Sequence, residues 1–213
     1  VRTDRYRLDH NGNLYDMVED FGQRKNIANQ KPKIAAKLRS SVKKWYAEMQ
    51  AELGKDERAF IIGHPDSVLT QVPARDGIAS GNIQRSNKFP NCSFFRNWTD
   101  VNDAVTWQAE IGTSGKYAVE MWYACEKDAV GTEVELSFND RSVRATITEA
   151  NPARLKGAEN DRFERVESYV KDFKPISLGV LNLKKGVGEL KLRATKIPGK
   201  EALEFRLLMF RRI

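Results

Sequence analysis

Residues 104–124 read AVTWQAEIGTSGKYAVEMWYA, and this stretch decides the fold class. Apolar side chains occupy every second position on both sides of the turn signal Thr113-Ser114-Gly115. They are Val105, Trp107, Ala109 and Ile111 before the turn, and Tyr117, Val119, Met121 and Tyr123 after it. A period of two is typical of strands that bury one face. The stretch therefore predicts two strands of one β domain, with Trp107 in its core.

The same pattern continues toward the C-terminus. Alternating or apolar runs lie at residues 134–138, 143–147, 176–183, 190–194 and 203–210. Turn signals separate them, namely Asn139-Asp140, Lys184-Lys185-Gly186 and Pro198-Gly199. About eight short strands with this spacing predict a mainly β fold, an antiparallel β-sandwich or jelly roll, over residues 59–213. Residues 75–99 and 149–174 are expected to be long irregular loops, and loops of this length are usually functional or packed as Ω-loops.

The N-terminal segment has a different pattern. Asn11-Gly12 lies between two short strand-like runs and predicts a β-hairpin over residues 5–17. Pro32 then opens a helix that Gly54 ends, and its apolar stripe comprises Ile34, Leu38, Val42, Trp45, Met49 and Leu53. Two short strands make too small a sheet to bury such a stripe. We therefore expect residues 1–54 to be the tail of a larger domain, and residues 55–58 to be a linker.

Composition excludes two classes of partner. The net charge is +7, but residues 1–55 carry 12 Lys/Arg against 7 Asp/Glu, and the rest of the chain carries 24 against 22. Because the densest basic run, 31–44, lies along the predicted helix, it indicates a solvated helix face and no nucleic-acid partner. No run approaches the roughly 18 apolar residues of a membrane span. A weak attraction to acidic glycans is compatible with this charge.

Two cysteines and two histidines limit the chemistry. Cys92 and Cys125 show no metal-binding spacing, so we expect no metal site. Two alternatives stay open for this pair: two buried thiols, or one disulfide that would stabilise the fold by about 3–4 kcal/mol. His10 and His64 leave little room for a histidine-based triad. Glu133 and Glu135 share the outer face of one predicted strand, where a solvated position is the simpler interpretation.

Three short motifs precede the predicted helix. Asp4-Arg5-Tyr6-Arg7 comes first, Leu14-Tyr15-Asp16-Met17 follows, and residues 19–28 read EDFGQRKNIA. This order resembles the C-terminal signature of sulfatases: an Arg-Tyr-Lys strand, a Leu-Phe/Tyr-Asp-Leu strand, an Asp-Pro-x-Glu-x-x-Asn-Leu turn and a long helix. Phe21, Gln23 and Ile27 depart from the usual Pro, Glu and Leu of the turn.

This resemblance covers residues 1–54 and points to bacterial, planctomycete-type sulfatases of the arylsulfatase and N-acetylgalactosamine-6-sulfatase kind. It implies a missing N-terminal catalytic domain as partner, a calcium ion in that parent enzyme, and a secreted or periplasmic location. It implies no cofactor in this chain. The family's Cys/Ser-x-Pro-Ser/Ala-x-Arg motif is absent here, because neither cysteine has a proline two positions later. We therefore expect no catalytic residue, and no sulfate-ester hydrolysis by this chain.

Five runs of the C-terminal region carry a second resemblance. Residues 104–107, 115–119, 123–125, 131–136 and 190–208 are similar to the galactose-binding-like, carbohydrate-binding-like β-sandwiches appended to some bacterial sulfatases and fucosidases. The resemblance implies an accessory module that binds a glycan, sulfated glycans included. The alternative is a purely structural domain that packs on the catalytic domain or mediates oligomerisation.

One loop cluster supplies candidate ligand-binding residues. The run from Phe94 to Trp98 places aromatic rings, a cation and an amide close together, and rings bind sugars by stacking. The candidates are Phe94, Arg96, Asn97, Trp98 and Trp122. Loop aromatics can equally plug the end of a sandwich core, and for these rings both interpretations stay open.

Overall fold

The computed structural model describes residues 1–53, 58–167 and 169–213. The chain divides into two units, Val1–Glu57 and Arg58–Ile213. The predicted linker at residues 55–58 falls mostly outside the described residues, as does Gly54, the predicted end of the helix. No helix in the described part of the chain combines the length and the apolar character that crossing a membrane requires.

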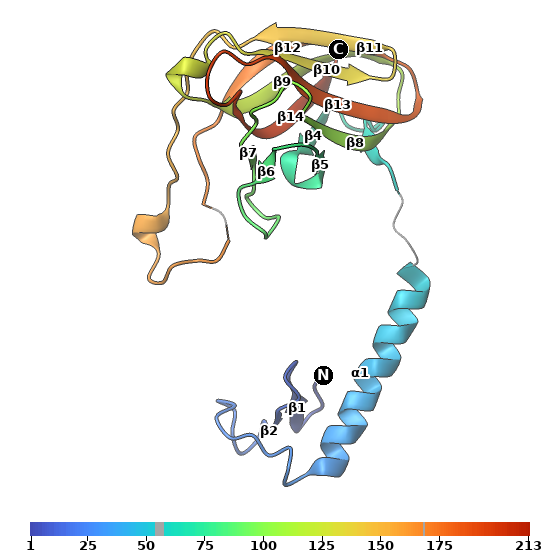
Figure 1. Cartoon of the computed structure of the whole chain (residues 1–213). Helices are drawn as coiled ribbons and strands as arrows, with labels where there is room; N and C mark the ends of the chain where they lie inside the picture. The colour runs from blue at the N-terminus through green and yellow to red at the C-terminus, as the bar shows by residue number, and fades with distance from the viewer. Residues whose placement is uncertain (54–57, 168) are drawn as a thin grey trace. The chain divides into compact units, whose positions relative to one another are not determined.

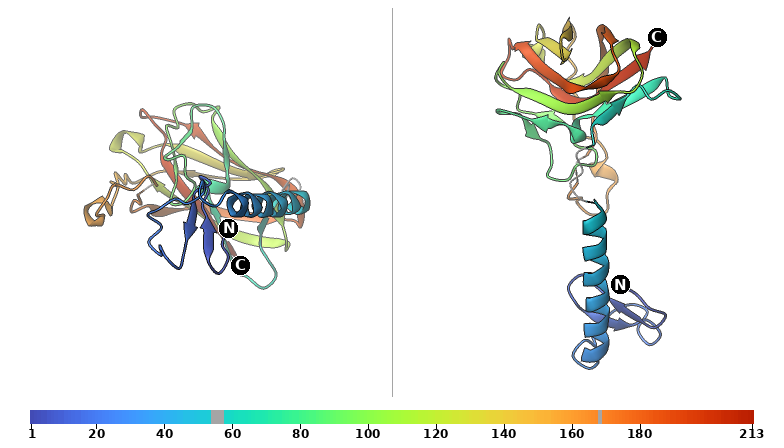
Figure 2. Two further views of the ribbon diagram at one scale, coloured as in Figure 1. Left: turned by 90° about the horizontal axis from the view of Figure 1, so that it is seen from below. Right: turned by 90° about the vertical axis from the view of Figure 1, so that its right-hand side faces the viewer.

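The first unit is the predicted hairpin and helix. Strands β1 (Tyr6–Leu8) and β2 (Leu14–Asp16) pair antiparallel, and helix α1 spans Pro32–Leu53. Figure 2 shows the strands beside the N-terminal half of the helix. Asp16 fixes the end of the hairpin, because its carboxylate lies 2.8 Å from Arg5 and accepts the amide of Val18 at 3.1 Å.

Only the first turns of the helix are buried. Leu8, Leu14, Ile27, Ala35 and Leu38 form a small core. Beyond them most of the predicted stripe is open: Val42 is 38% exposed, Trp45 59% and Leu53 63%, while Met49 is half-buried. Because each strand has three residues, the sheet reaches no farther along the helix. The expectation that this unit cannot bury its own stripe is confirmed.

The second unit is a β-sandwich, as predicted (Figure 1). The β8 sheet has the strand order β11-β10-β13-β8-β3, and β5 also pairs with β8. Its strands are β3 (Phe60–Ile62), β5 (Ile78–Ala79), β8 (Ala104–Ile111), β10 (Glu133–Phe138), β11 (Arg141–Thr146) and β13 (Gly186–Lys196).

The β9 sheet has the order β12-β9-β14-β7-β6, and β4 also pairs with β14. Its strands are β4 (Leu69–Pro73), β6 (Gln84–Arg85), β7 (Phe95–Arg96), β9 (Gly115–Ala124), β12 (Lys174–Leu183) and β14 (Glu204–Arg212). All described pairings are antiparallel except that of β3 with β8, which is parallel. Short 3₁₀ turns lie at Ala74–Asp76, Lys127–Ala129 and Ala158–Asn160.

Residues 104–111 and 115–124 form two strands with alternating burial, as predicted. Side chains from β8 and β9 that share the period of two point into one core, and Trp107 and Tyr117 are 2% and 1% exposed. Trp107 donates from Nε1 to the Pro73 carbonyl at 3.3 Å and packs edge-on against Phe205. Buried polar groups need such partners. Trp107 is therefore structural, as predicted.

Two sequence expectations need correction. Residues 75–99 are not wholly irregular, because β5, β6 and β7 lie within them. Glu135 is not a solvated strand residue: it is 7% exposed and lies 2.6 Å from Arg144 and 2.7 Å from Arg193. Both arginines are its register neighbours on β11 and β13. Burial raises the pKa of Glu135, but these two partners outweigh it and hold the pKa below its usual range.

Candidate functional site at one end of the sandwich

A cavity of about 260 Å³ opens where β9 ends and β14 begins. Its floor comes from Ala124 and Cys125 on one side and from Leu203 and Glu204 on the other. These two strand ends meet because the pairing is antiparallel and Glu204 lies opposite Ala124. The remaining lining residues are Glu126, Asp128, Asn151, Pro152, Ala153, Arg154, Lys171, Lys200 and Glu201.

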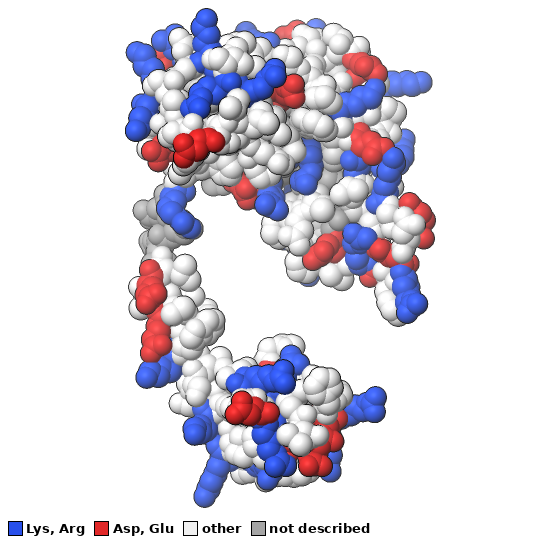
Figure 3. Space-filling model, turned by 180° about the vertical axis from the view of Figure 1, so that it is seen from behind, with Lys and Arg blue, Asp and Glu red and all other residues white. Residues whose placement is uncertain are grey.

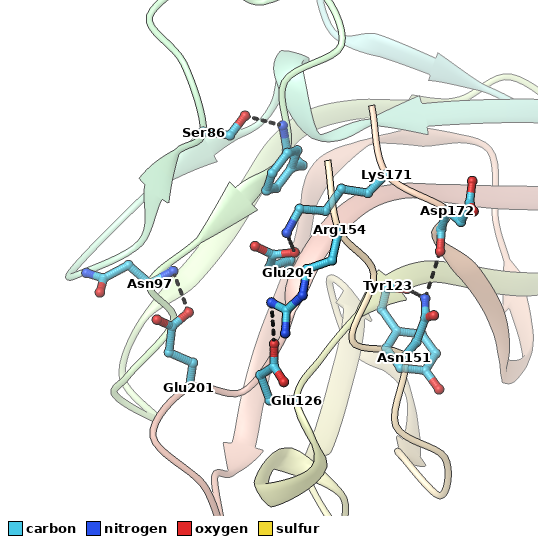
Figure 4. Close-up of polar contacts among 11 residues, drawn as sticks. Ser86, Asn97, Tyr123, Glu126, Asn151, Arg154, Lys171, Asp172, Glu201 and Glu204 are labelled. Atoms are coloured by element: carbon cyan, nitrogen blue, oxygen red, sulfur yellow. Dashed lines mark hydrogen bonds and ion pairs between the residues drawn. The ribbon is translucent and has the colours of Figure 1, made fainter. Parts of the chain in front are cut away.

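Asn151 attaches the long loop after β11 to this strand end. Its backbone exchanges two hydrogen bonds with Cys125, at 3.0 and 3.1 Å. Its side-chain amide donates to the carbonyls of Tyr123 and Asp172, at 3.0 and 2.9 Å (Figure 4). One buried side chain thus holds both ends of the loop, so that Arg154 and Lys171 are delivered to the same cavity.

Charges of both signs line the cavity. Arg154 lies 3.1 Å from Glu126, and Lys171 lies 2.5 Å from Glu204 (Figure 4). The Lys171–Glu204 side chains are 12% and 22% exposed, against 78% and 60% for the other pair. Because water screens exposed ion pairs strongly, the Lys171–Glu204 pair is the stronger interaction of the two. The face of the molecule drawn in Figure 3 likewise mixes both signs.

The arrangement suits a polar, uncharged or mixed ligand. Carboxylates accept hydrogen bonds from hydroxyl groups, and lysine and arginine donate to them. None of the described lining residues is aromatic, so a stacking platform is absent from this wall. The described residues also contain no group of three or more His, Cys, Asp or Glu side chains that could hold a metal ion.

Phe94 and Trp98 are plugs in this structure. Trp98 is 0% exposed and Phe94 is 4% exposed. The carbonyl of Trp98 accepts the amide of Ala202 at 2.8 Å, and the ring of Phe94 lies 5.1 Å beneath the ammonium of Lys171. The Phe94 ring thus lies under a lining residue, whereas the contact from Trp98 is made by its backbone. Of the two interpretations left open for these rings, this burial favours the core plug, because neither ring has a face open to a sugar.

The other three predicted residues lie apart. Arg96 is exposed on β7 and does not line the cavity. Asn97 adopts a left-handed backbone with φ 59°, and its backbone N–H donates to the Glu201 carboxylate at 3.0 Å, so it positions a lining residue (Figure 4). Trp122 is half-buried, and its indole N–H has no hydrogen-bond partner within the described structure.

None of the residues that line this cavity was predicted from the sequence as a ligand-binding residue. Glu126, Asn151, Arg154, Lys171 and Glu201 come from three separate connections. No spacing rule links them. The one available signal was the length of the 149–174 loop, which supplies Asn151, Arg154 and Lys171.

The two cysteines differ in burial in the described structure: Cys125 is buried and Cys92 is half-buried. Both Cys92 and Cys125 are free, and no disulfide joins them. Cys125 faces inward as predicted, is 6% exposed, and has its sulfur 4.0 Å from the Glu149 carbonyl. Burial raises the pKa of this thiol above its usual range. Cys92 lies in the turn after Pro90, away from that pairing.

Comparisons with known proteins concern the fold. No family model matches the chain, and no curated protein does either. Similar solved structures include the C-terminal CBM6 of LamC, a laminarinase from Zobellia galactanivorans, with 10% identity over 68% of this chain and 99% of that chain, at a TM-score of 0.46. A family 35 carbohydrate binding module from Clostridium thermocellum has 16% identity over 69% of this chain and 100% of that chain, at a TM-score of 0.46.

The mosquito-larvicidal Cry4Aa toxin from Bacillus thuringiensis has 13% identity over 68% of this chain and 23% of the toxin chain, at a TM-score of 0.50. At such identities the likeness is one of fold alone.

Proposed function

We propose that the second unit is an accessory glycan-binding module and that the cavity between β9 and β14 receives a sugar residue. The mixed wall of this cavity carries the proposal. Carboxylates at Glu126 and Glu201 offer acceptors, and Arg154 and Lys200 offer donors, within one opening of about 260 Å³. Neighbouring sugar hydroxyl groups need both kinds of partner, because each both donates and accepts.

The expected affinity is weak. The wall offers hydrogen bonds without a stacking ring, and most of the gain from such bonds is lost to desolvation and ordering. A dissociation constant around 1 mM, about −4 kcal/mol, is therefore expected. Such a value suits an accessory module that keeps a larger enzyme near its substrate.

Arg154→Ala is expected to weaken glycan binding about tenfold, since it removes one charge-assisted donor from the wall. Its side chain is 78% exposed, so the fold will tolerate the loss. Glycan-array screening of the full chain identifies the sugar, and titration calorimetry then compares the variants. Arg96→Ala is the matched control: Arg96 is exposed, belongs to the loop cluster and does not line the cavity.

Two results would contradict this proposal. Loss of binding in Arg96→Ala with retention in Arg154→Ala would move the site to the loop cluster. A wild-type chain that binds no glycan on the array would end the assignment altogether.

We also propose that residues 1–54 are the C-terminal subdomain of a secreted or periplasmic sulfatase, and that this chain does not hydrolyse sulfate esters by itself. The motif order around Leu14-Tyr15-Asp16-Met17 supports this, together with the hairpin and helix that follow the expected sequence. The gene sequence upstream of Val1 tests it. A Cys/Ser-x-Pro-Ser/Ala-x-Arg motif is expected there, and an unrelated upstream reading frame would refute the parentage.

One observation favours a second function, that of a structural unit. The open face of α1 presents Val42, Trp45, Tyr46 and Leu53, each at least 38% exposed. Exposed apolar surface of this kind usually marks a protein interface. The first unit can therefore serve as a packing surface whether or not the second unit binds a glycan.

A further inference from the structure

A second cavity, of about 280 Å³, lies beside β4, the 3₁₀ turn that follows it, and one residue of β14. Its lining residues are Phe60, Gln71, Pro73, Arg75, Asp76 and Arg206. It shares no lining residue with the first cavity. What it could bind follows from its two arginines.

Arg206 occupies an irregularity in β14. The pairing of β14 with β9 shifts between Phe205 and Leu207, which leaves Arg206 as the extra residue. Bulges of this kind re-aim a side chain and are frequent near functional sites. The guanidinium is half-buried and donates from Nη1 to the Ser93 carbonyl at 2.9 Å. One edge of the group is therefore fixed, and its other donors are available to the cavity.

Arg75 is held next to it by a third arginine. Arg85 donates to the Arg75 carbonyl at 2.9 Å and to the Ser93 hydroxyl at 3.3 Å, and its guanidinium lies 5.2 Å from the Phe95 ring centre. Ser93 is thus a shared contact of Arg85 and Arg206. The backbone that carries Arg75 is anchored while its side chain, 49% exposed, remains at the cavity.

Negative charge is scarce around these arginines. Elsewhere Arg144, Arg193 and Arg165 each lie within 2.7 Å of a carboxylate. Within the described residues no carboxylate pairs with Arg206 or with Arg85, and Asp76 approaches only Arg75, at 3.8 Å. Burial lowers the pKa of Arg206, and the like charge of Arg75 lowers it further, although Cys92 acts in the opposite direction. Arginine nevertheless stays charged, so these positive groups repel one another.

We propose that Arg75 and Arg206 form a binding site for an oxyanion, a sulfate or a carboxylate group, with Gln71 as a neutral donor beside them. Guanidinium groups present paired N–H donors that match both kinds of oxyanion. An anion between the two arginines would relieve their repulsion; the one carboxylate among the described lining residues is Asp76, which lies 3.8 Å from Arg75 and makes no ion pair with Arg206. The group can come from an acidic saccharide or from a free inorganic ion. The site is independent of the glycan cavity, because the two share no residue.

The test is titration calorimetry of the full chain at low salt with four probes: a sulfated oligosaccharide, an oligogalacturonate, a neutral oligosaccharide and inorganic sulfate. Anionic probes are expected to bind with an affinity that falls as salt rises. The double variant Arg75→Met and Arg206→Met is expected to weaken this binding about ten- to a hundredfold. Methionine keeps the apolar stem of each side chain, and circular dichroism verifies the fold.

Two single variants separate a built site from general charge attraction. Asp76→Asn removes the one nearby counter-charge and is expected to tighten anion binding, by up to about fivefold. Arg211→Met is the control, because Arg211 is exposed on the same strand and lines neither cavity. It is expected to leave binding unchanged.

The outcomes are distinct. Saccharide binding well above that of inorganic sulfate identifies an acidic glycan as the ligand, and equal binding identifies the free ion. Equal losses in Arg211→Met and the double variant would overturn the site. The site would also be overturned if Asp76→Asn and the double variant each bound the anionic probes as tightly as the wild type does. If only the neutral oligosaccharide fails to bind, the result contradicts the proposed glycan cavity and leaves the oxyanion site in place.

Discussion

Trp98→Ala is expected to lower the free energy of unfolding of the sandwich by about 3–5 kcal/mol. The side chain is 0% exposed, and its indole N–H has no hydrogen-bond partner within the described residues. The loss is therefore almost entirely one of packing and transfer free energy, with a cavity left behind. Urea denaturation followed by circular dichroism measures it.

Phe163→Ala is the control for this prediction. Phe163 is 81% exposed in the same unit, so its truncation should change stability by no more than about 0.5 kcal/mol. A stable Trp98→Ala variant that had lost glycan binding would instead restore Trp98 as a ligand platform.

Gly63→Ala is expected to cost about 2–5 kcal/mol of stability, as the sum of two effects. Gly63 adopts φ +75°, a left-handed conformation that disfavours a Cβ. An added Cβ would also lie 1.9 Å from the hydroxyl oxygen of Tyr117. Tyr117 cannot easily withdraw, because it is 1% exposed and packs against Phe210. Thermal and urea unfolding both measure the effect.

Two variants separate the backbone cost from the steric cost. Gly131→Ala places alanine at φ +97°, where the nearest atom, Pro198 Cγ, is 3.7 Å away. It should show only the backbone part, about 1–2 kcal/mol. Tyr117→Phe combined with Gly63→Ala should recover part of the loss, since it removes the closest atom. Equal costs for the two alanine variants would show that the contact with Tyr117 has no effect.

Features of the fold that depend on short-range pattern follow from the sequence. The alternation around Trp107 and Tyr117 predicted a β-sandwich, and the sandwich is present. Asn11-Gly12 and Pro32 predicted the hairpin and the start of the helix, and both are found. Each depends on a local property: strand and helix periods place apolar groups on one face, and turn residues permit particular backbone angles.

The environment of single side chains was beyond such patterns. Glu135 was expected to be solvated because alternation placed it on the outer face. It is buried because Arg144 and Arg193, its neighbours across two strands, lie over it. The solvent exposure of a residue on the outer face depends on the side chains opposite it on the adjacent strands, and only the strand register says which these are.

By itself the sequence determined the two-part organisation, the mainly β class, and an aromatic cluster at Phe94 to Trp98 that belongs to the ordered end of the sandwich. Only the tertiary structure decided that Phe94 and Trp98 face inward, and that the open polar wall is built from Glu126, Asn151 and Arg154 with partners on other connections. A loop aromatic is a plug or a platform according to what covers it. That cover comes from residues far along the chain, here Lys171 over the ring of Phe94, and periodicity within a segment carries no information about them.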